Sequence, residues 1–244
     1  MFACTLNDIA ERQISAKERR SGAVSTILSL RDIQKVYKTA SGNVAALRGV
    51  SFDFEQGLFY AIIGRSGSGK STLLHILGGL DRPTSGQILI DGKDIYAMND
   101  EQMAIFRRRH MGFVFQQFNL LNEYNVQKNI CMPMILDGRK PNPGFFKEVV
   151  NTLGLRDKLR KYPSELSGGE QQRVAIARSV LAKPELIIAD EPTGNLDKKT
   201  GDEVLNLLTS CAARFGQTLI MVTHNPEIAD KADCTICIQD GAIL

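Results

Sequence analysis

The stretch LFYAIIGRSGSGKSTLLHILGGL, residues 58–80, decides the fold of this chain. Its first part, LFYAIIG, is a short apolar run that ends in glycine, which is typical of a buried strand. Its last part, KSTLLHILGGL, carries apolar residues at helical spacing. Between them, residues 64–71 match the pattern G-x-x-x-x-G-K-[ST]. The strand and the helix on either side are the context that this phosphate-binding loop requires.

Each residue type in this loop has a chemical reason. Glycines let successive backbone N–H groups turn inward on phosphates, and the helix that starts near Lys70 adds its N-terminal dipole. We expect Lys70 to reach the β- and γ-phosphates of ATP and the Ser71 hydroxyl to coordinate Mg²⁺. An ordinary flexible Gly/Ser loop is the alternative, and the flanking elements disfavour it. The residues predicted to bind the nucleotide here are Gly64, Arg65, Ser66, Gly67, Ser68, Gly69, Lys70, Ser71 and Thr72.

The rest of the chain predicts an α/β fold with a mainly parallel core sheet. Before the loop, residues 27–37 alternate like a strand, and residues 44–57 are predicted as a turn that feeds a second strand. Residues 84–95 and 234–244 are predicted as hairpins, so an antiparallel β subdomain accompanies the core. From 98 to 165, helical stretches alternate with breaks containing Asn and Pro, and only GFVFQ is strand-like. Later segments predict helices at 171–182 and 200–216 and buried strands at 184–190 and 217–224.

The distribution of these predicted elements indicates two boundaries along the chain. Residues 1–26 are polar and weakly periodic, so we expect a flexible N-terminal extension. Residues 27–244 should form one nucleotide-binding domain, with a helical subdomain at about 118–165.

Composition limits the function classes. The net charge of +3 is too small to indicate a nucleic-acid partner. No stretch approaches the roughly 18 apolar residues of a membrane span, and the N-terminus is not a secretory signal. Any membrane role is therefore expected to depend on a partner. The five scattered cysteines suit a reducing cytoplasm. A zinc or redox site at Cys234 and Cys237 is disfavoured, because residues three apart on a strand face opposite sides of the sheet.

A second motif, LSGGEQQR at residues 166–173, stands directly before a predicted helix. This string resembles the signature of ATP-binding-cassette (ABC) proteins, and the resemblance extends over residues 27–244. Ser167, Gly168 and Gly169 at a helix start form a second anion site. In the ABC family, the signature of one subunit caps the γ-phosphate held by the loop of the other. An ordinary Ser N-cap with Glu170 in a capping box is the other interpretation, and both can hold together.

The resemblance implies roles for six further residues. Asp190, at the end of a buried strand, should bind Mg²⁺, and Glu191 should polarise the attacking water as a general base. Asp197 ends the PTGNLD segment, which looks like the family's D-loop. Gln116 matches the Q-loop glutamine that senses Mg²⁺ and water, with Gln117 as the alternative. His224 matches the switch histidine at the γ-phosphate. Tyr37 matches the aromatic residue that stacks on adenine, with a position in the core as its alternative.

Within the ABC family, LLHILGGLDRPTSG, GFVFQQFNLL and ADEPTGNLD resemble the lipoprotein-release, macrolide-export and peptide-resistance branch. This implies a bacterial ATPase that binds and hydrolyses ATP with Mg²⁺, forms a homodimer on ATP and drives a membrane permease from the cytoplasmic face. Soluble ABC ATPases of DNA repair or translation and cell-division-type regulatory ATPases are the alternatives. Repair members carry long insertions and translation members carry two cassettes, and neither fits 244 residues. The intact Lys70, Glu191 and His224 disfavour a non-hydrolysing regulatory subunit. The sequence does not identify the transported ligand.

Overall fold

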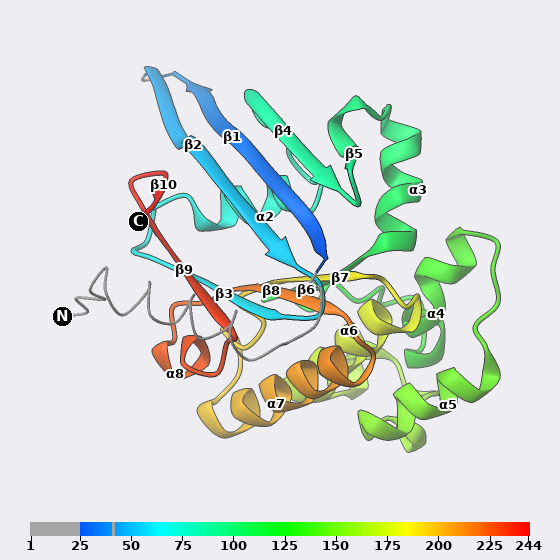
Figure 1. Cartoon of the computed structure of the whole chain (residues 1–244). Helices are drawn as coiled ribbons and strands as arrows, with labels where there is room; N and C mark the ends of the chain where they lie inside the picture. The colour runs from blue at the N-terminus through cyan, green and yellow to red at the C-terminus, as the bar shows by residue number, and fades with distance from the viewer. Residues whose placement is uncertain (1–24, 41) are drawn as a thin grey trace. The chain divides into compact units, whose positions relative to one another are not determined.

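A computed structural model describes residues 25–40 and 42–244 of the chain. They divide into two compact units, the described residues up to Met103 with Ile220–Leu244 (unit 1) and Ala104–Leu219 (unit 2), and the strands and α-helices of each are labelled in Figure 1. The expected N-terminal extension lies outside the described residues except for its last two positions. Of these, Thr26 already belongs to the first strand.

Unit 1 contains an antiparallel sheet in the order β2-β1-β4-β5. Its strands are β1 (Thr26–Thr39), β2 (Gly42–Glu55), β4 (Ser85–Ile90) and β5 (Lys93–Asp94), and β4 and β5 form the first predicted hairpin. The turn predicted to feed a second strand within residues 44–57 is wrong in its first part, because β2 already begins at Gly42 and pairs with β1 from there. The ladder shifts register near Asp32 and Gly49, which both have a positive φ. Such an irregularity hides the alternation that normally marks a strand.

The remaining elements of unit 1 hold the phosphate loop. They are β3 (Phe59–Ile63), α2 (Lys70–Leu77), the 3-10 turn η1 (Ile95–Ala97), β8 (Thr218–Val222, whose first two residues belong to unit 2), α8 (Pro226–Ala229), β9 (Cys234–Gln239) and β10 (Ala242–Ile243). β3 is buried on both faces, as its apolar run predicts, and pairs in parallel with β9. β9 and β10 form the predicted last hairpin. The strand–loop–helix unit predicted at 58–80 is confirmed.

Unit 2 is built around one buried helix, α6 (Gly168–Leu181), which packs on β6, α4, α5 and α7. The other elements are α3 (Asp100–His110, which begins in unit 1), β6 (Met111–Phe115), α4 (Val126–Leu136), α5 (Pro143–Thr152), η2 (Arg156–Lys158), η3 (Pro163–Glu165), β7 (Leu186–Asp190) and α7 (Lys198–Arg214). β6 and β7 pair in parallel. Gly112 lets β6 approach α6 closely, because a Cβ there would lie 2.6 Å from the Ser179 carbonyl oxygen.

These elements confirm the predicted α/β class, with parallel strand pairs, an antiparallel β portion and many helices. Between residues 118 and 165 the regular elements are α4, α5, η2 and η3. The boundaries of a helical subdomain there stay a prediction. Across the described residues, no helix combines the length and the apolar character needed to cross a membrane.

Candidate active site

The phosphate loop runs from Gly64, after β3, to Lys70, the first residue of α2. Gly64 has a φ of 155°, and a Cβ at this position would overlap the Ile238 carbonyl oxygen and lie 2.7 Å from Ser68 Oγ. The start of the loop therefore has no room for a side chain. Gly69, the N-cap residue of α2, provides no side-chain cap, so first-turn N–H groups of this helix point at an open end. An uncapped helix N-terminus of this kind favours a bound anion.

Two polar side chains of the loop fit a phosphate group. The Ser68 hydroxyl is buried and has no hydrogen-bond partner within the described part of the chain. Buried polar groups without a partner are rare, so Ser68 indicates an acceptor that arrives from outside the chain. Lys70 is 8% exposed, and its ammonium donates across the loop to the Arg65 carbonyl oxygen at 2.8 Å. This bond keeps Lys70 inside the loop, where the β- and γ-phosphates are expected.

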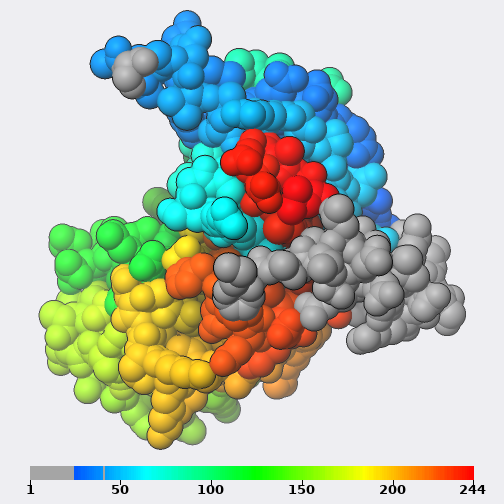
Figure 2. Space-filling view, turned by 90° about the vertical axis from the view of Figure 1, so that its left-hand side faces the viewer, coloured from blue at the N-terminus to red at the C-terminus, as the bar shows by residue number. Residues whose placement is uncertain are grey.

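The C-terminal hairpin supports the loop from outside. The Gly241 N–H donates to the Ser68 carbonyl oxygen at 3.0 Å, and the Gly241 carbonyl accepts from the Arg48 N–H at 2.8 Å. Figure 2 shows the red C-terminal residues directly against the cyan residues that follow β3. The backbone of the hairpin thus helps to fix the shape of the phosphate loop.

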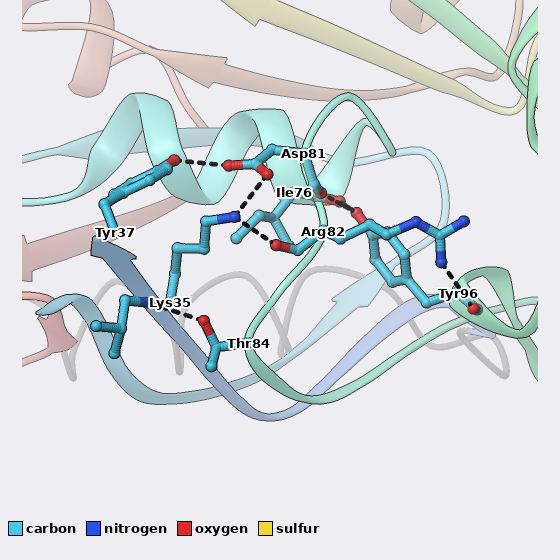
Figure 3. A network of polar contacts seen from close by, with 8 residues as sticks. Lys35, Tyr37, Ile76, Asp81, Arg82, Thr84 and Tyr96 are labelled. Carbon is cyan, nitrogen blue, oxygen red and sulfur yellow. Dashed lines mark hydrogen bonds and ion pairs between the residues drawn. The ribbon is translucent and has the colours of Figure 1, made fainter. Parts of the chain in front are cut away.

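Tyr37 lies on β1 and is 36% exposed, so the alternative that placed it in the core is wrong. Its hydroxyl donates to Asp81 at 2.6 Å, and the Lys35 ammonium lies 4.7 Å from its ring centroid (Figure 3). Burial and the hydrogen bond to Asp81 raise the pKa of Tyr37, so the hydroxyl keeps its proton at neutral pH. An exposed aromatic face of this kind can stack on a planar base.

His224 lies two residues after the end of β8 and is exposed. The preceding residue, Thr223, continues the strand pairing by donating its N–H to the Ile62 carbonyl oxygen at 3.1 Å. The next residue, Asn225, caps α8 with its side chain. His224 therefore lies in the short connection between β8 and α8 of unit 1.

The signature forms the N-terminus of α6 in unit 2. The Ser167 hydroxyl accepts from the Glu170 N–H at 3.3 Å, and the Glu170 carboxylate accepts from the Ser167 N–H at 2.8 Å. The predicted capping box is confirmed. It uses the N–H groups of Ser167 and Glu170 and, as far as the described residues go, leaves those of Gly168 and Gly169 to another acceptor. The second anion site and the capping box are thus compatible.

An ion pair reinforces the capping box. Lys158, at the end of η2, donates to Glu170 at 2.8 Å. This hydrogen bond and the one from the Ser167 backbone lower the pKa of Glu170 to about 2. Glu170 is therefore anionic near neutral pH, and its charge lies where the helix dipole favours it.

The two signature glycines also pack against their own chain. A Cβ on Gly168 would lie 3.3 Å from Leu196 Cδ2, and a Cβ on Gly169 would overlap Thr200 Cγ2. Leu196 belongs to the PTGNLD segment, and Thr200 is in the first turn of α7. The anion role expected from the sequence is therefore only one reason for glycine at these positions, and close packing is another.

Gln116 follows β6 and pairs with the PTGNLD segment. Its Nε2 donates to Asn195 Oδ1 at 3.0 Å, while Asn195 Nδ2 donates back to the Gln116 carbonyl oxygen at 3.1 Å. A Cβ on Gly194 would lie 2.8 Å from Gln116 Nε2. Because the amide nitrogen is engaged, Oε1 is the atom that Gln116 can offer to a metal ion or a water. Gln117 makes no such contact within the described residues and is exposed.

The acidic residues of unit 2 have distinct surroundings. Asp190 ends β7, and Glu191 follows it with a φ of 44°, a left-handed conformation that is uncommon for a residue with a side chain. Such conformations gather at functional sites. Asp197 is the N-cap of α7 and accepts from the Thr200 N–H at 3.1 Å. Its hydrogen bonds with Thr200 lower its pKa.

The predicted residues fall into two groups. Unit 1 carries Tyr37, the phosphate loop and His224, whereas unit 2 carries Gln116, Asp190, Glu191, Asp197 and the signature. Sequence reasoning missed several residues that hold these groups in place. One is Gln172, which is fully buried and whose Nε2 donates both to the Phe115 carbonyl, before Gln116, and to the Pro192 carbonyl, after Glu191. The others are Asn195, Lys158 and Asp81.

Comparison with known proteins identifies the class. The sequence profile of the ABC transporter family matches residues 47–194, more than half of the chain, and the chain belongs to this family. It is 49% identical over 219 residues to an uncharacterized ABC transporter ATP-binding protein of Thermotoga maritima, covering 89% of this chain and 93% of that protein. It is 44% identical to the lipoprotein-releasing system ATP-binding protein LolD of Cytophaga hutchinsonii, covering 89% of this chain and 99% of that protein.

A solved structure agrees. A bacterial ABC transporter cassette crystallised as a dimer superimposes with a TM-score of 0.80 and 37% identity, covering 88% of this chain and 96% of that one. The same cassette is known as a post-hydrolysis dimer bound to ADP and phosphate. The chain is thus an ATP-binding and ATP-hydrolysing subunit of an ABC transporter. The predicted branch is confirmed, and this outcome favours the transport function over the soluble and regulatory alternatives.

Proposed function

We propose that two copies of this chain form an ATP-driven pair at the cytoplasmic face of a membrane, where they move a permease. The observation that carries the nucleotide part is the buried Ser68 hydroxyl, which has no partner among the described residues, near Lys70 and an uncapped helix N-terminus. Together with the Lys70 ammonium, these groups provide donors suited to an anion. The phosphates of ATP supply that anion, and Tyr37 supplies a stacking surface for the base.

The proposed roles in hydrolysis follow the chemistry of each side chain. Mg²⁺, bound with the nucleotide, would neutralise charge on the phosphates. Oxygen ligands suit this ion, and Ser71, Asp190 and Gln116 through Oε1 offer them. Glu191 orients and deprotonates the attacking water, and His224 contacts the γ-phosphate. Asp197 shapes the start of α7 beside the signature.

The signature supplies the reason for a pair. The capping box leaves the N–H groups of Gly168 and Gly169, in the first turn of a helix, without an acceptor among the described residues. In the proposed pair, Ser167, Gly168 and Gly169 of one copy cover the γ-phosphate on the loop of the other. Water is then excluded while hydrolysis proceeds. Loss of the γ-phosphate removes the shared contact, and the pair opens.

Residues 118–140 are the proposed permease contact. Four apolar side chains there are exposed, from 37% to 61%, namely Leu121, Tyr124, Ile135 and Leu136. Neighbouring exposed apolar residues of this kind are typical of a protein interaction surface. The name LolD denotes the ATPase of a lipoprotein-releasing system, and a permease subunit is the expected partner of such an ATPase. Crosslinks from a permease loop to residues 27–60 alone would contradict this assignment.

The test of the pair uses Glu191→Gln, which slows hydrolysis and spares binding. Size-exclusion chromatography of this variant should give a dimer with ATP and a monomer with ADP. Adding Ser167→Arg should abolish the dimer, because the long side chain blocks the signature. A monomer under all conditions would rule out the cross-subunit role of the signature.

A further inference from the structure

A polar network fixes the position of Tyr37. Its hydroxyl donates to one oxygen of Asp81 at 2.6 Å, and the Lys35 ammonium donates to the other oxygen at 2.6 Å and to the Arg82 carbonyl at 2.7 Å. The side chains of Lys35, Tyr37 and Asp81 converge in Figure 3 from β1 and from the segment after α2. Burial alone would raise the pKa of Asp81, but the hydrogen bonds from Lys35 and Tyr37 outweigh it and lower the pKa. Asp81 is therefore an anionic acceptor for both groups.

Asp81 itself is held rigidly at the end of α2. The Tyr96 hydroxyl oxygen lies 2.5 Å from the Asp81 carbonyl oxygen and 2.6 Å from the Ile76 carbonyl oxygen, and its single proton is shared between these two acceptors. The Asp81 side chain is 31% exposed and that of Lys35 only 12%, so the ion pair is partly shielded from water. A carboxylate with a fixed backbone and two charge-assisted or phenolic donors has little freedom to move.

The network joins Tyr37 to the phosphate loop. The Thr72 side chain, in the first turn of α2, is close enough to the Tyr37 hydroxyl to lower its pKa. The phenolic oxygen therefore lies near the beginning of α2 and is hydrogen-bonded to Asp81 in the segment after its end. Lys35 lies over the ring at 4.7 Å from the centroid, yet the side chain keeps 36% of its surface exposed. The ring is fixed relative to the loop and remains accessible to a planar partner.

We infer that Asp81 is a positioning residue for nucleotide binding, which holds the ring of Tyr37 at the place where the adenine base must stack once the phosphates are on the loop. This role rests on the proposed stacking by Tyr37. It concerns the base alone, because the side-chain hydrogen bonds of Asp81 among the described residues go to Lys35 and Tyr37 and not to Ser68 or Lys70. A side chain that only stabilised the fold would influence base and phosphate binding alike.

The experiment measures two dissociation constants by isothermal titration, one for Mg-ATP and one for Mg-tripolyphosphate, which lacks the base. Asp81→Ala should weaken ATP binding about fivefold, from the loss of one hydrogen bond that orders the ring, and leave tripolyphosphate binding unchanged. Asp81→Asn, which still accepts from Tyr37, should restore most of the affinity. Asp100→Ala is the matched control, because this exposed carboxylate pairs with Arg82 at 3.2 Å and does not touch Tyr37.

Two further variants separate the inference from its basis. Tyr37→Ala should weaken ATP binding about tenfold or more, since a stacked base is lost. In the Tyr37→Phe background, Asp81→Ala should have no additional effect. If Tyr37→Ala changes the ratio of the two constants and Asp81→Ala does not, the positioning role is wrong and stacking stands. If Tyr37→Ala leaves the ratio unchanged, stacking itself is wrong and the role of Asp81 fails with it. If Asp81→Ala weakened the binding of both ligands equally, Asp81 would have only a structural role.

Discussion

Replacing Gly169 by alanine tests whether the signature glycines serve packing as well as anion binding. The new Cβ would overlap Thr200 Cγ2, so the added methyl group would lie against its own chain and not against a partner. Overpacking of a buried site destabilises by about 1–3 kcal/mol. Alanine regains about 1 kcal/mol over glycine in a helix, so the net loss should be about 1 kcal/mol.

Removing the methyl group that causes the overlap should rescue the variant. Thr200→Ser deletes Cγ2 and keeps both a hydroxyl at this position and the backbone N–H that donates to Asp197. Alone, it should lose about 0.5 kcal/mol of buried methyl surface at this half-buried position. With Gly169→Ala, the nearest remaining atom is Thr200 Cβ at 3.9 Å, an ordinary contact. The double variant should be as stable as the wild type or slightly more stable, which is a coupling of about 2 kcal/mol between the two positions.

The assay is urea unfolding of the four proteins, followed by their ATPase rates. Gly168→Ala is the control, because its Cβ would lie 3.3 Å from Leu196 Cδ2, which can shift, and at an ordinary contact distance of 3.5 Å from Phe118 Cζ. The double variant should recover both stability and ATPase activity, since an alanine keeps the backbone N–H that an anion needs. Additive losses of stability would refute the packing argument. Recovered stability without activity would show that glycine at 169 has a separate role in catalysis.

Three further predictions concern single side chains. Lys70→Ala should weaken Mg-ATP binding by about 2 kcal/mol or more, because a charge-assisted contact to phosphate is lost, and wild-type affinity in a titration would contradict the loop assignment. Glu191→Gly and Glu191→Ala should both lack ATPase activity. The glycine variant should be about 1 kcal/mol more stable towards urea, because glycine adopts the positive φ of position 191 without strain. Equal stabilities of the two variants would show that this backbone conformation carries no strain. Lys158→Met should make stability depend less on pH in the acid range. The pKa of Glu170 is about 2 against 4.5 for a free side chain, so its contribution to stability is complete above about pH 4.5 and is lost as the pH falls towards 2. An unchanged curve of unfolding free energy against pH would exclude the ion pair with Lys158 as the cause of the lowered pKa.

Local patterns predicted the parts of the site that local interactions build. The phosphate loop needs only a strand, glycines and a helix in succession, and the cap of α6 needs only Ser167 and Glu170 three residues apart. Both features could therefore be predicted from the sequence. The apolar runs of β3 and β7 were equally clear, because a strand buried on both faces leaves a continuous signal.

Features that depend on distant partners could not be predicted. Residues 44–49 join β2 because β1 supplies their hydrogen bonds, and the shifted register hides their alternation. Pro133 lies inside α4, although proline in this region suggested a break. The overlap between position 169 and Thr200, and the two carbonyl contacts of Gln172, join segments that are remote in sequence. No spacing rule covers such contacts.

The support that the last hairpin gives to the phosphate loop has a consequence for the order of folding. Gly241 hydrogen-bonds to Ser68, and β9 pairs with β3, so the loop depends on residues that leave the ribosome about 170 positions after it. Bringing together residues this far apart in the sequence costs more conformational entropy than forming α2 alone, and it is therefore slower. A nascent chain that has not yet exposed the hairpin would present an incomplete cradle to ATP. Nucleotide binding would then begin only after β9 and β10 have been synthesised and have folded, and a shorter nascent chain would not compete for ATP or join a pair.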